Sequence, residues 1–257
     1  MTLLNASPSD RWFRRPLAPA TGRLRLLCFP PAGSGANFYR QWSHLMPAAI
    51  EVLAVQYPGR EDRIVEPLCE SLASLVDGIA QAAMTLREKP LALFGHSMGA
   101  AVAHETAKRL EAAGIRIEHL FVSGRPPPHR QRSKAIHRRD DDGVLAEIAR
   151  LGGTPSAVLE NAELRALLLP SIRADFHLIE TYEGGLVPAL RAPVSAFIGT
   201  ADTEVGQQEA VQWADVTGGA FDLTCYEGGH FYLVDRPAPL IRALTAKLSA
   251  MAWPCTP

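Results

Sequence analysis

The stretch from Leu91 to Leu110, LALFGHSMGAAVAHETAKRL, constrains the fold more than any other part of this sequence. It begins with a short apolar run and continues through the turn G-H-S-M-G, Gly95 to Gly99, into a helix-like segment of small residues. G-x-S-x-G between a strand and a helix holds its serine at the apex of a strained turn at the end of a sheet. The flanking glycines are required because side chains there would collide with the neighbouring strand and helix. The pattern predicts that Ser97 is a nucleophile exposed over the edge of a sheet.

The length and composition set the class of protein. The chain has 257 residues, 47% hydrophobic and 21% charged, enough for one large α/β domain with or without an inserted cap. A formal net charge of −1 gives no general attraction to nucleic acid or to a membrane. The four cysteines lack C-x-x-C spacing, which disfavours a zinc site or a disulfide scaffold and fits a reducing cytosol. Because the sequence also lacks a secretory signal and an apolar run of roughly 20 residues, we expect a soluble cytoplasmic protein.

Strand and helix patterns alternate along most of the chain, which predicts a mostly parallel central sheet with helices on both faces. The expected strands are Leu24–Phe29, Glu51–Tyr57, Leu91–Phe94, His119–Ser123, Val194–Thr200 and Phe221–Tyr226. The expected helices are Tyr39–Met46, Leu68–Leu86, a segment from Ser97 to about Ala113, and Pro237–Met251. Residues 1–22 are polar and broken by prolines. We expect them to form a loosely packed arm that Trp12 and Phe13 pin to a single domain spanning residues 23–257.

The alternation stops after the strand that ends at Ser123. The next segment, Gly124–Arg139, is rich in proline and strongly basic, and helical patterns follow at about Asp142–Leu151 and Asn161–Tyr182. No strand is predicted until Val194, so the sequence contains an insertion at about residues 125–190, which we interpret as a helical lid. Because the insertion follows a strand end, we expect it over the same sheet edge as the serine of the turn.

Two charged segments each allow two interpretations. The basic run Arg125–Arg139 is either a docking patch for an acidic partner or a phosphate-bearing substrate, or a solvated and mobile surface loop. In the loop that begins at Pro58, Arg60 and Arg63 either reach an anionic group or belong to a solvated charged loop. The basic run stays open between its two interpretations, whereas for Arg60 and Arg63 we favour the solvated loop.

Three polar residues follow three predicted strand ends: Ser97, Asp202 and His230. The carboxyl ends of parallel strands lie at one edge of a sheet, and the chain order Ser, Asp, His is that of the α/β-hydrolase catalytic triad. A serine hydroxyl is a weak nucleophile until a base takes its proton, which is the role expected of His230. Asp202 would hold the histidine in the correct tautomer and stabilise its charged form. The sequence therefore predicts an α/β-hydrolase fold with a Ser–His–Asp site.

Each role has competitors. Glu204 and Asp222 are alternative acids, although Asp222 lies within a predicted strand. His96 adjoins the serine, but its side chain is expected to point away from it along the turn. Four other histidines lie on helices, on a strand or in the insertion, where a structural or exposed position is expected: His104, His119, His137 and His177.

Two backbone N–H groups are candidates for the oxyanion hole. The first belongs to Met98, directly after the serine. The second belongs to Ala32, in the small-residue loop Pro30–Phe38, where a backbone can approach a ligand closely. An ordinary strand-to-helix turn is the alternative interpretation of this loop, which lacks the G-K-[ST] and G-x-G-x-x-G phosphate-binding patterns.

With these elements in place, the chain resembles the type II thioesterases of polyketide and nonribosomal peptide biosynthesis, in the α/β-hydrolase superfamily. The resemblance covers about residues 23–250. It rests on five motifs, which are FPPAGSGA (29–36), YPGRE (57–61), FGHSMGA (94–100), GTAD (199–202) and GGHFYL (228–233). The family commonly has F-P-H-A-G-G in the first motif, whereas this chain has Pro31 in place of the histidine and Ser34 in place of the second glycine. Ala32 still falls at the position that supplies the second oxyanion N–H in the family.

The resemblance implies hydrolysis of acyl thioesters carried on the phosphopantetheine arm of carrier proteins, which clears stalled or wrongly loaded acyl groups. It implies an acyl-enzyme on Ser97, no metal or redox cofactor, a lid that shapes the acyl pocket, and a monomer. Carrier proteins are acidic, so the resemblance gives the basic run a possible partner. Alternatives with the same chemistry are a chain-releasing fatty-acyl thioesterase and a carboxylesterase. An alternative of another class is a non-catalytic binding protein with a hydrolase fold.

Overall fold

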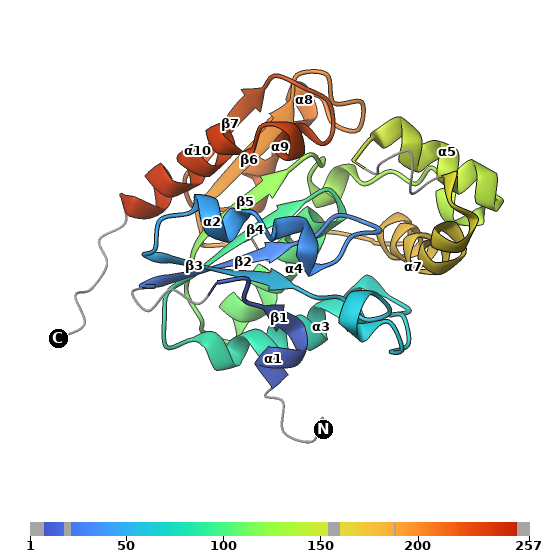
Figure 1. Cartoon of the computed structure of the whole chain (residues 1–257). Helices are drawn as coiled ribbons and strands as arrows, with labels where there is room; N and C mark the ends of the chain where they lie inside the picture. The colour runs from blue at the N-terminus through green and yellow to red at the C-terminus, as the bar shows by residue number, and fades with distance from the viewer. Residues whose placement is uncertain (1–7, 18–21, 154–159, 188, 251–257) are drawn as a thin grey trace, which may run out of the picture.

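The computed structural model describes residues 8–17, 22–153, 160–187 and 189–250. In this part of the chain, seven strands form one sheet in the order β1-β3-β2-β4-β5-β6-β7, and only β1 runs antiparallel to its neighbour (Figure 1). The strands are β1 Phe13–Arg14, β2 Leu24–Phe29, β3 Ile50–Val55, β4 Leu91–His96, β5 Ile117–Ser123, β6 Val194–Gly199 and β7 Phe221–Tyr226. The mostly parallel sheet that the sequence predicts is therefore confirmed.

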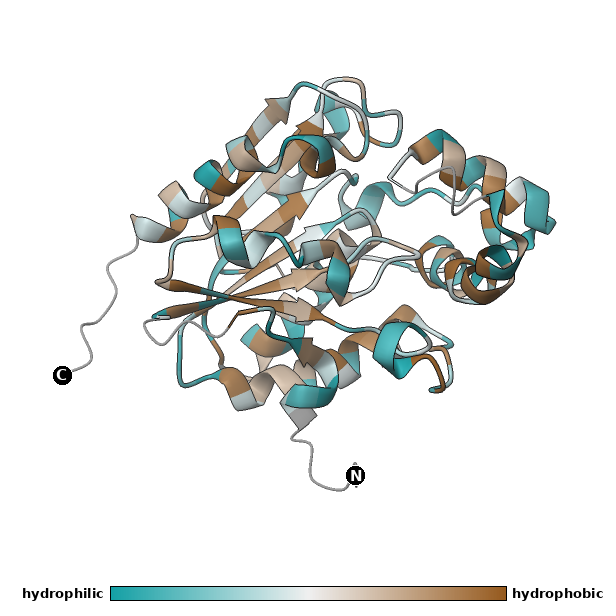
Figure 2. Ribbon diagram, in the orientation of Figure 1, coloured by the Kyte–Doolittle hydropathy of each residue, from teal (hydrophilic) through white to brown (hydrophobic). Residues whose placement is uncertain are grey.

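Helices cover both faces of the sheet because its central strands β2, β4 and β5 are predominantly apolar and need burial on both sides. Helices α1 (Pro8–Trp12), α3 (Leu72–Ala83) and α4 (Met98–Ala112) cover one face, and α2 (Trp42–Leu45), α9 (Tyr232–Asp235) and α10 (Pro237–Ser249) cover the other. The short helix α8 (Gln207–Ala210) packs beside β6. Figure 2 shows brown, hydrophobic residues along much of the strands. Each face of the sheet therefore carries its own hydrophobic core.

The N-terminal segment differs from the loosely packed arm expected of it. Residues Phe13 and Arg14 form an edge strand that pairs with β3, with Phe13 opposite Val55. Phe13 is buried in the core, and the indole of Trp12 lies directly over Gly78 of α3. The expectation of loose packing is wrong for residues 8–17 because the free edge of β3 offers backbone partners, and the two aromatic side chains do anchor the segment. The remainder of the arm lies outside the described residues.

The described residues of the insertion include the helices α5 (Asp141–Leu151) and α7 (Ala162–Glu180), which lie beyond the carboxyl edge of the sheet and end within two residues of the predicted segments (Figure 1). Each begins at a side-chain cap, Asp140 for α5 and Asn161 for α7, whose oxygens accept backbone N–H groups of the first turn. The two helices bury a small core of their own, formed by Ile136, Val144, Ile148, Leu169 and Ile172. We call the described residues of 125–190 the lid.

None of the helices in the described part of the chain has the length and apolar character needed to cross a membrane.

Candidate active site

The turn Gly95–Gly99 holds Ser97 in a conformation that few residues adopt. Its φ is 54° and its ψ is −119°, so the serine has a positive φ without being glycine. A Cβ at Gly95 would lie 2.1 Å from the carbonyl oxygen of Gly99, and a Cβ at Gly99 would lie 2.0 Å from that of Phe29. Both glycines are therefore required by close backbone packing, which is the reason expected from the sequence.

The loops after β6 and β7 bring the predicted acid and base together. Nδ1 of His230 lies 3.0 Å from Oδ2 and 3.1 Å from Oδ1 of Asp202. Both side chains are buried, and the backbone N–H of Glu204 donates a second hydrogen bond to Oδ1 of Asp202 at 2.8 Å. Nε2 of His230 is buried and has no hydrogen-bond partner among the described residues. The histidine is thus held by the carboxylate on one side and is available to a substrate or a nucleophile on the other.

Tight packing between these two loops fixes their separation. The N–H of Ala201 donates to the carbonyl of Gly228 at 2.8 Å. A Cβ at Gly199 would lie 2.3 Å from the carbonyl oxygen of Gly229. Because the two backbones touch directly, the distance between the acid and the base depends on glycines that the motifs GTAD and GGHFYL contain.

The competing acids occupy other positions. The Glu204 carboxylate pairs with Lys134 at 2.8 Å and also with Arg150. Burial raises the pKa of Glu204, but hydrogen bonds from Lys134 and Arg150 outweigh burial and lower it below the ordinary value. Asp222 bonds to Ser195 and Lys247, within and beside β7. Asp202 is therefore the carboxylate that contacts His230.

His96 lies beneath the site as a structural residue. Its side chain is fully buried, and its Nδ1 lies 2.9 Å from the hydroxyl of Ser123. Its ring centroid is 4.9 Å from that of His230. Burial is the main cause that lowers the pKa of His96 well below its ordinary value, with a smaller contribution from the nearby His230. His96 is therefore neutral and supports the ring above it.

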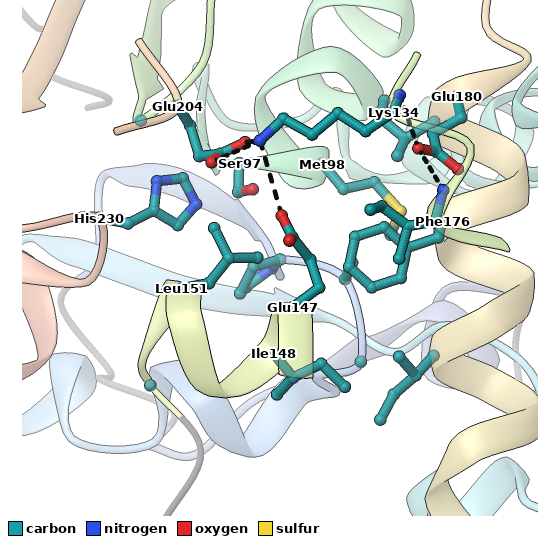
Figure 3. Close-up of a pocket in the computed structure, with 18 of the residues that line it drawn as sticks. Ser97, Met98, Lys134, Glu147, Ile148, Leu151, Phe176, Glu180, Glu204 and His230 are labelled. Carbon is teal, nitrogen blue, oxygen red and sulfur yellow. Dashed lines mark hydrogen bonds and ion pairs between the residues drawn. The ribbon is translucent and has the colours of Figure 1, made fainter. Parts of the chain in front are cut away.

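One cavity of about 370 Å³ joins Ser97, Met98, Ala32 and His230 beneath the lid (Figure 3). In Figure 3, His230 and Phe176 lie on opposite sides of this cavity. The lid supplies most of the apolar lining, which consists of Ile136, Leu145, Ile148, Leu151, Leu168, Leu169, Ile172, Phe176 and Ile179. The structure therefore brings all five predicted site residues to one region, four on the cavity and Asp202 behind His230.

The two candidate oxyanion donors follow β4 and β2. Met98 is the first residue of α4, so its N–H has no intrahelical acceptor. Ala32 lies in a tight turn in which the N–H of Ser34 donates to the carbonyl of Pro31 at 3.1 Å, and Gly33 has a φ of 75°. Only the third position of such a turn requires glycine, and Gly33 fills it. The two departures from the family pattern, Pro31 and Ser34, fall at the turn's outer positions, where other residues fit.

The solvated loop expected around Arg60 and Arg63 is wrong, because both side chains are buried. Arg63 donates to the carbonyl of Gln56 and pairs with Glu66. Arg60 pairs with the buried Asp175 of α7, a residue that the sequence analysis did not single out. The sequence contains one signal for Asp175, because its carboxylate lies at helical spacing among the apolar residues of the buried face of α7.

The basic run Arg125–Arg139 is ordered by contacts within the chain. Arg132 pairs with Glu209, and Lys134 pairs with Glu204 and Glu147. The Glu180 carboxylate accepts backbone N–H groups of the run at residues 134, 136 and 137. Several of its charges are therefore neutralised by the body and the lid.

Within the described residues, no group of three or more His, Cys, Asp or Glu side chains could hold a metal ion.

Comparison with known proteins identifies the family. The family model for the thioesterase domain matches residues 24–248. A probable cadicidin biosynthesis thioesterase of Streptomyces griseus is 42% identical over 87% of this chain, which spans 62% of that relative's length. The thioesterase PikA5 of Streptomyces venezuelae is 41% identical over 89% of this chain and 82% of its own length.

A solved structure agrees in sequence and in fold. The type II thioesterase BorB, from the borrelidin biosynthetic cluster, is 39% identical and superposes with a TM-score of 0.87. The match covers 93% of this chain and 98% of BorB. A family match over nearly the whole chain, a shared fold and the geometry around Ser97 lead to one conclusion. The chain belongs to the thioesterase family and is a type II thioesterase, a serine hydrolase of the α/β-hydrolase fold.

Proposed function

We propose that this enzyme hydrolyses acyl thioesters on the phosphopantetheine arm of carrier proteins and so clears stalled or aberrant acyl groups from polyketide or nonribosomal peptide synthases. The observation that carries the proposal is the buried His230–Asp202 pair. Nε2 of His230 has no hydrogen-bond partner in the described part of the chain, and His230 lines the same cavity as Ser97. The relative named as a probable cadicidin biosynthesis thioesterase and the structure of BorB from the borrelidin biosynthetic cluster support the substrate class.

The proposed reaction has two stages. Nε2 of His230 takes the proton of Ser97 as the hydroxyl attacks the thioester carbonyl, and the carrier thiol leaves with that proton. Water then attacks the acyl-serine ester, again with His230 as the base, and releases the free acid. In both stages the N–H groups of Met98 and Ala32 would stabilise the oxyanion. The chemistry needs no metal or redox cofactor.

The cavity supports an aliphatic acyl group as the substrate. Nine apolar side chains of the lid line it, so transfer of an alkyl chain out of water onto them is favourable by about 0.8 kcal/mol for each CH₂ group that becomes buried. Among the ionic groups of the cavity, Lys134 is paired with Glu204 and Glu147, and Arg132 is paired with Glu209. The binding energy is therefore expected to come from the chain and the pantetheine amides rather than from a charge on the acyl group.

Parallel assays on one acyl group presented as a carrier thioester, a coenzyme A thioester and a p-nitrophenyl ester test the proposal. We expect the highest kcat/KM on the carrier thioester and no turnover by Ser97→Ala, with an unchanged far-UV spectrum and Tm. A preference for the free ester over both thioesters would overturn the carrier assignment. Unchanged hydrolysis by Ser97→Ala would overturn the mechanism.

The proposal includes a monomer acting in the cytoplasm, where carrier proteins are loaded. Sedimentation at several protein concentrations checks the oligomeric state, and a mass that rises with concentration would contradict a monomer.

A further inference from the structure

A buried ion pair connects the loop after β3 to the lid helix α7. Asp175 of α7 is 1% exposed and Arg60 is 6% exposed. Nη2 of Arg60 donates to Oδ1 of Asp175 at 2.8 Å, and Nη1 donates to Oδ2. Burial alone would lower the pKa of Arg60, but the Asp175 carboxylate raises it above its ordinary value, so the guanidinium stays charged. The two side chains thus form a two-point contact between the YPGRE motif and the lid.

The same pair also forms two hydrogen bonds with the turn Pro31–Ser34. Oδ2 of Asp175 accepts the backbone N–H of Gly33 at 2.7 Å. Nη1 of Arg60 donates to the carbonyl of Ser34 at 3.2 Å. The turn is therefore held on its N–H side by the lid and on its carbonyl side by the loop after β3.

These two hydrogen bonds affect the direction of the candidate oxyanion donor, the N–H of Ala32. In a planar trans peptide the carbonyl and the N–H point in opposite directions. The Pro31 carbonyl points into the turn, because it accepts the N–H of Ser34, so the N–H of Ala32 in the same peptide points outward. Anything that holds Gly33 and Ser34 in place keeps the turn closed and keeps the Ala32 N–H in that direction.

Packing places the lid helix against the turn as well. A Cβ at Gly33 would lie 2.8 Å from Cγ1 of Ile172, one helical turn before Asp175. There is no space for a side chain between the turn and α7, and the Asp175 carboxylate holds the Gly33 N–H. The turn and the lid helix are therefore in direct contact at Gly33.

We propose that Asp175 and Arg60 are positioning residues that fix the Ala32 turn in its oxyanion-binding conformation and tie that conformation to the seated position of the lid. The inference rests on the proposed function, since it assumes that Ala32 stabilises an oxyanion. Under it, the oxyanion hole is complete only while α7 is docked. Displacement of the lid would leave the Ser97 and His230 side chains in place but would weaken stabilisation of the transition state.

Removing one partner of a buried ion pair leaves an uncompensated charge, which by itself destabilises a fold, so a single variant is compared with a double variant that removes both charges. Asp175→Asn keeps the shape and one acceptor but loses the charge that holds Arg60. The double variant Arg60→Met with Asp175→Leu leaves no buried charge and removes both contacts to the turn. Arg63→Gln is the matched control, because Arg63 is an equally buried arginine whose partners are Gln56 and Glu66.

The assay separates positioning from structural support through three measurements on the full chain. These are kcat and KM on an acyl thioester of N-acetylcysteamine, the Kd of the matching non-hydrolysable thioether, and the Ki of the matching trifluoromethyl ketone. The ketone forms an oxyanion on the serine, whereas the thioether does not. For Asp175→Asn and the double variant we expect kcat to fall roughly tenfold to a hundredfold and the ketone Ki to rise by a similar factor. The thioether Kd is expected to stay within about twofold of the unmodified enzyme, as for a lost transition-state contact.

A fall in kcat equal to that of Arg63→Gln at matched Tm would overturn the inference, because the pair would then be structural. Unchanged kcat and ketone Ki in a folded double variant would overturn it as well. Either result leaves the proposed function standing, since the unmodified enzyme would still hydrolyse thioesters through Ser97. An unmodified enzyme without thioesterase activity would overturn both.

Discussion

Nδ1 of His230 lies 3.0 Å from Oδ2 of Asp202, and the Asp202 side chain is completely buried. A carboxylate so placed fixes the tautomer in which Nε2 is free to accept the serine proton. We predict that Asp202→Asn lowers kcat by about a thousandfold or more with little change in Tm, because an amide can hold the ring in the wrong tautomer. Steady-state kinetics on an acyl thioester measures the effect.

Glu204→Gln is the matched control, two residues along the same loop. Its carboxylate pairs with Lys134 and Arg150 rather than with the histidine. We expect its kcat to stay within about tenfold of the unmodified enzyme. A larger loss of kcat in Glu204→Gln than in Asp202→Asn would mean that Glu204, rather than Asp202, orients His230.

The second prediction concerns the close backbone contact between the turn Gly95–Gly99 and the end of β2. A Cβ added by Gly99→Ala would lie 2.0 Å from the carbonyl oxygen of Phe29, in the centre of the sheet, where neither backbone can retreat. We expect a loss of about 3 kcal/mol or more in the free energy of unfolding, measured by urea denaturation. Gly206→Ala, whose Cβ would meet nothing within 4 Å, serves as the control. Equal stability of the two variants would contradict the packing argument.

The next prediction concerns how much the contacts of Arg150 stabilise the docked position of the lid. From α5 it donates to the Thr203 hydroxyl at 2.6 Å and pairs with Glu204, so it connects the lid to the loop that carries Asp202. An ion pair of this exposure contributes little, and we expect Arg150→Ala to raise amide exchange in residues 144–151 only about two- to fivefold. Hydrogen–deuterium exchange read by mass spectrometry gives the rates.

Arg236→Ala provides the comparison, because Arg236 pairs with Glu227 on the surface outside the lid. It should leave exchange in α5 unchanged. Equal increases in amide exchange of α5 in the two variants would show that the contact of Arg150 with the loop that carries Asp202 and Glu204 does not hold the lid.

The pH dependence of stability follows in part from His119. Burial, helped by the charge of Lys247 and opposed by Asp222, lowers its pKa from 6.5 to about 4. Between these values the unfolded chain binds a proton that the folded chain does not, so the free energy of unfolding falls as the pH falls from 6.5 to 4. The contribution of this residue is up to about 3 kcal/mol.

His119→Gln keeps a donor for the hydroxyl of Ser195, which lies 2.7 Å from Nε2, and cannot titrate in this range. Urea unfolding at several pH values should show a shallower loss of stability in acid for this variant. The loss should not vanish, because burial also lowers the pKa of His96. A slope identical to that of the unmodified protein would refute the assignment.

Local patterns in the sequence were enough to predict the sheet, the turn Gly95–Gly99 and the chain order in which Ser97, Asp202 and His230 follow the strands. Strand and helix periodicity is local, and parallel strands necessarily bring their carboxyl ends to one edge. Ser97, Asp202 and His230 each follow a strand end, so their meeting could be predicted without knowing any side-chain contact.

The tertiary structure alone decided the contacts that depend on how separate segments pack. Arg60 and Asp175 are 115 residues apart, and no periodicity relates a loop after β3 to a helix of the lid. The edge strand at Phe13 likewise exists because β3 leaves backbone groups unpaired, which the polar composition of the N-terminal segment does not reveal. Long-range pairing of charges and edges is set by the final packing of the chain, and only the folded structure specifies it.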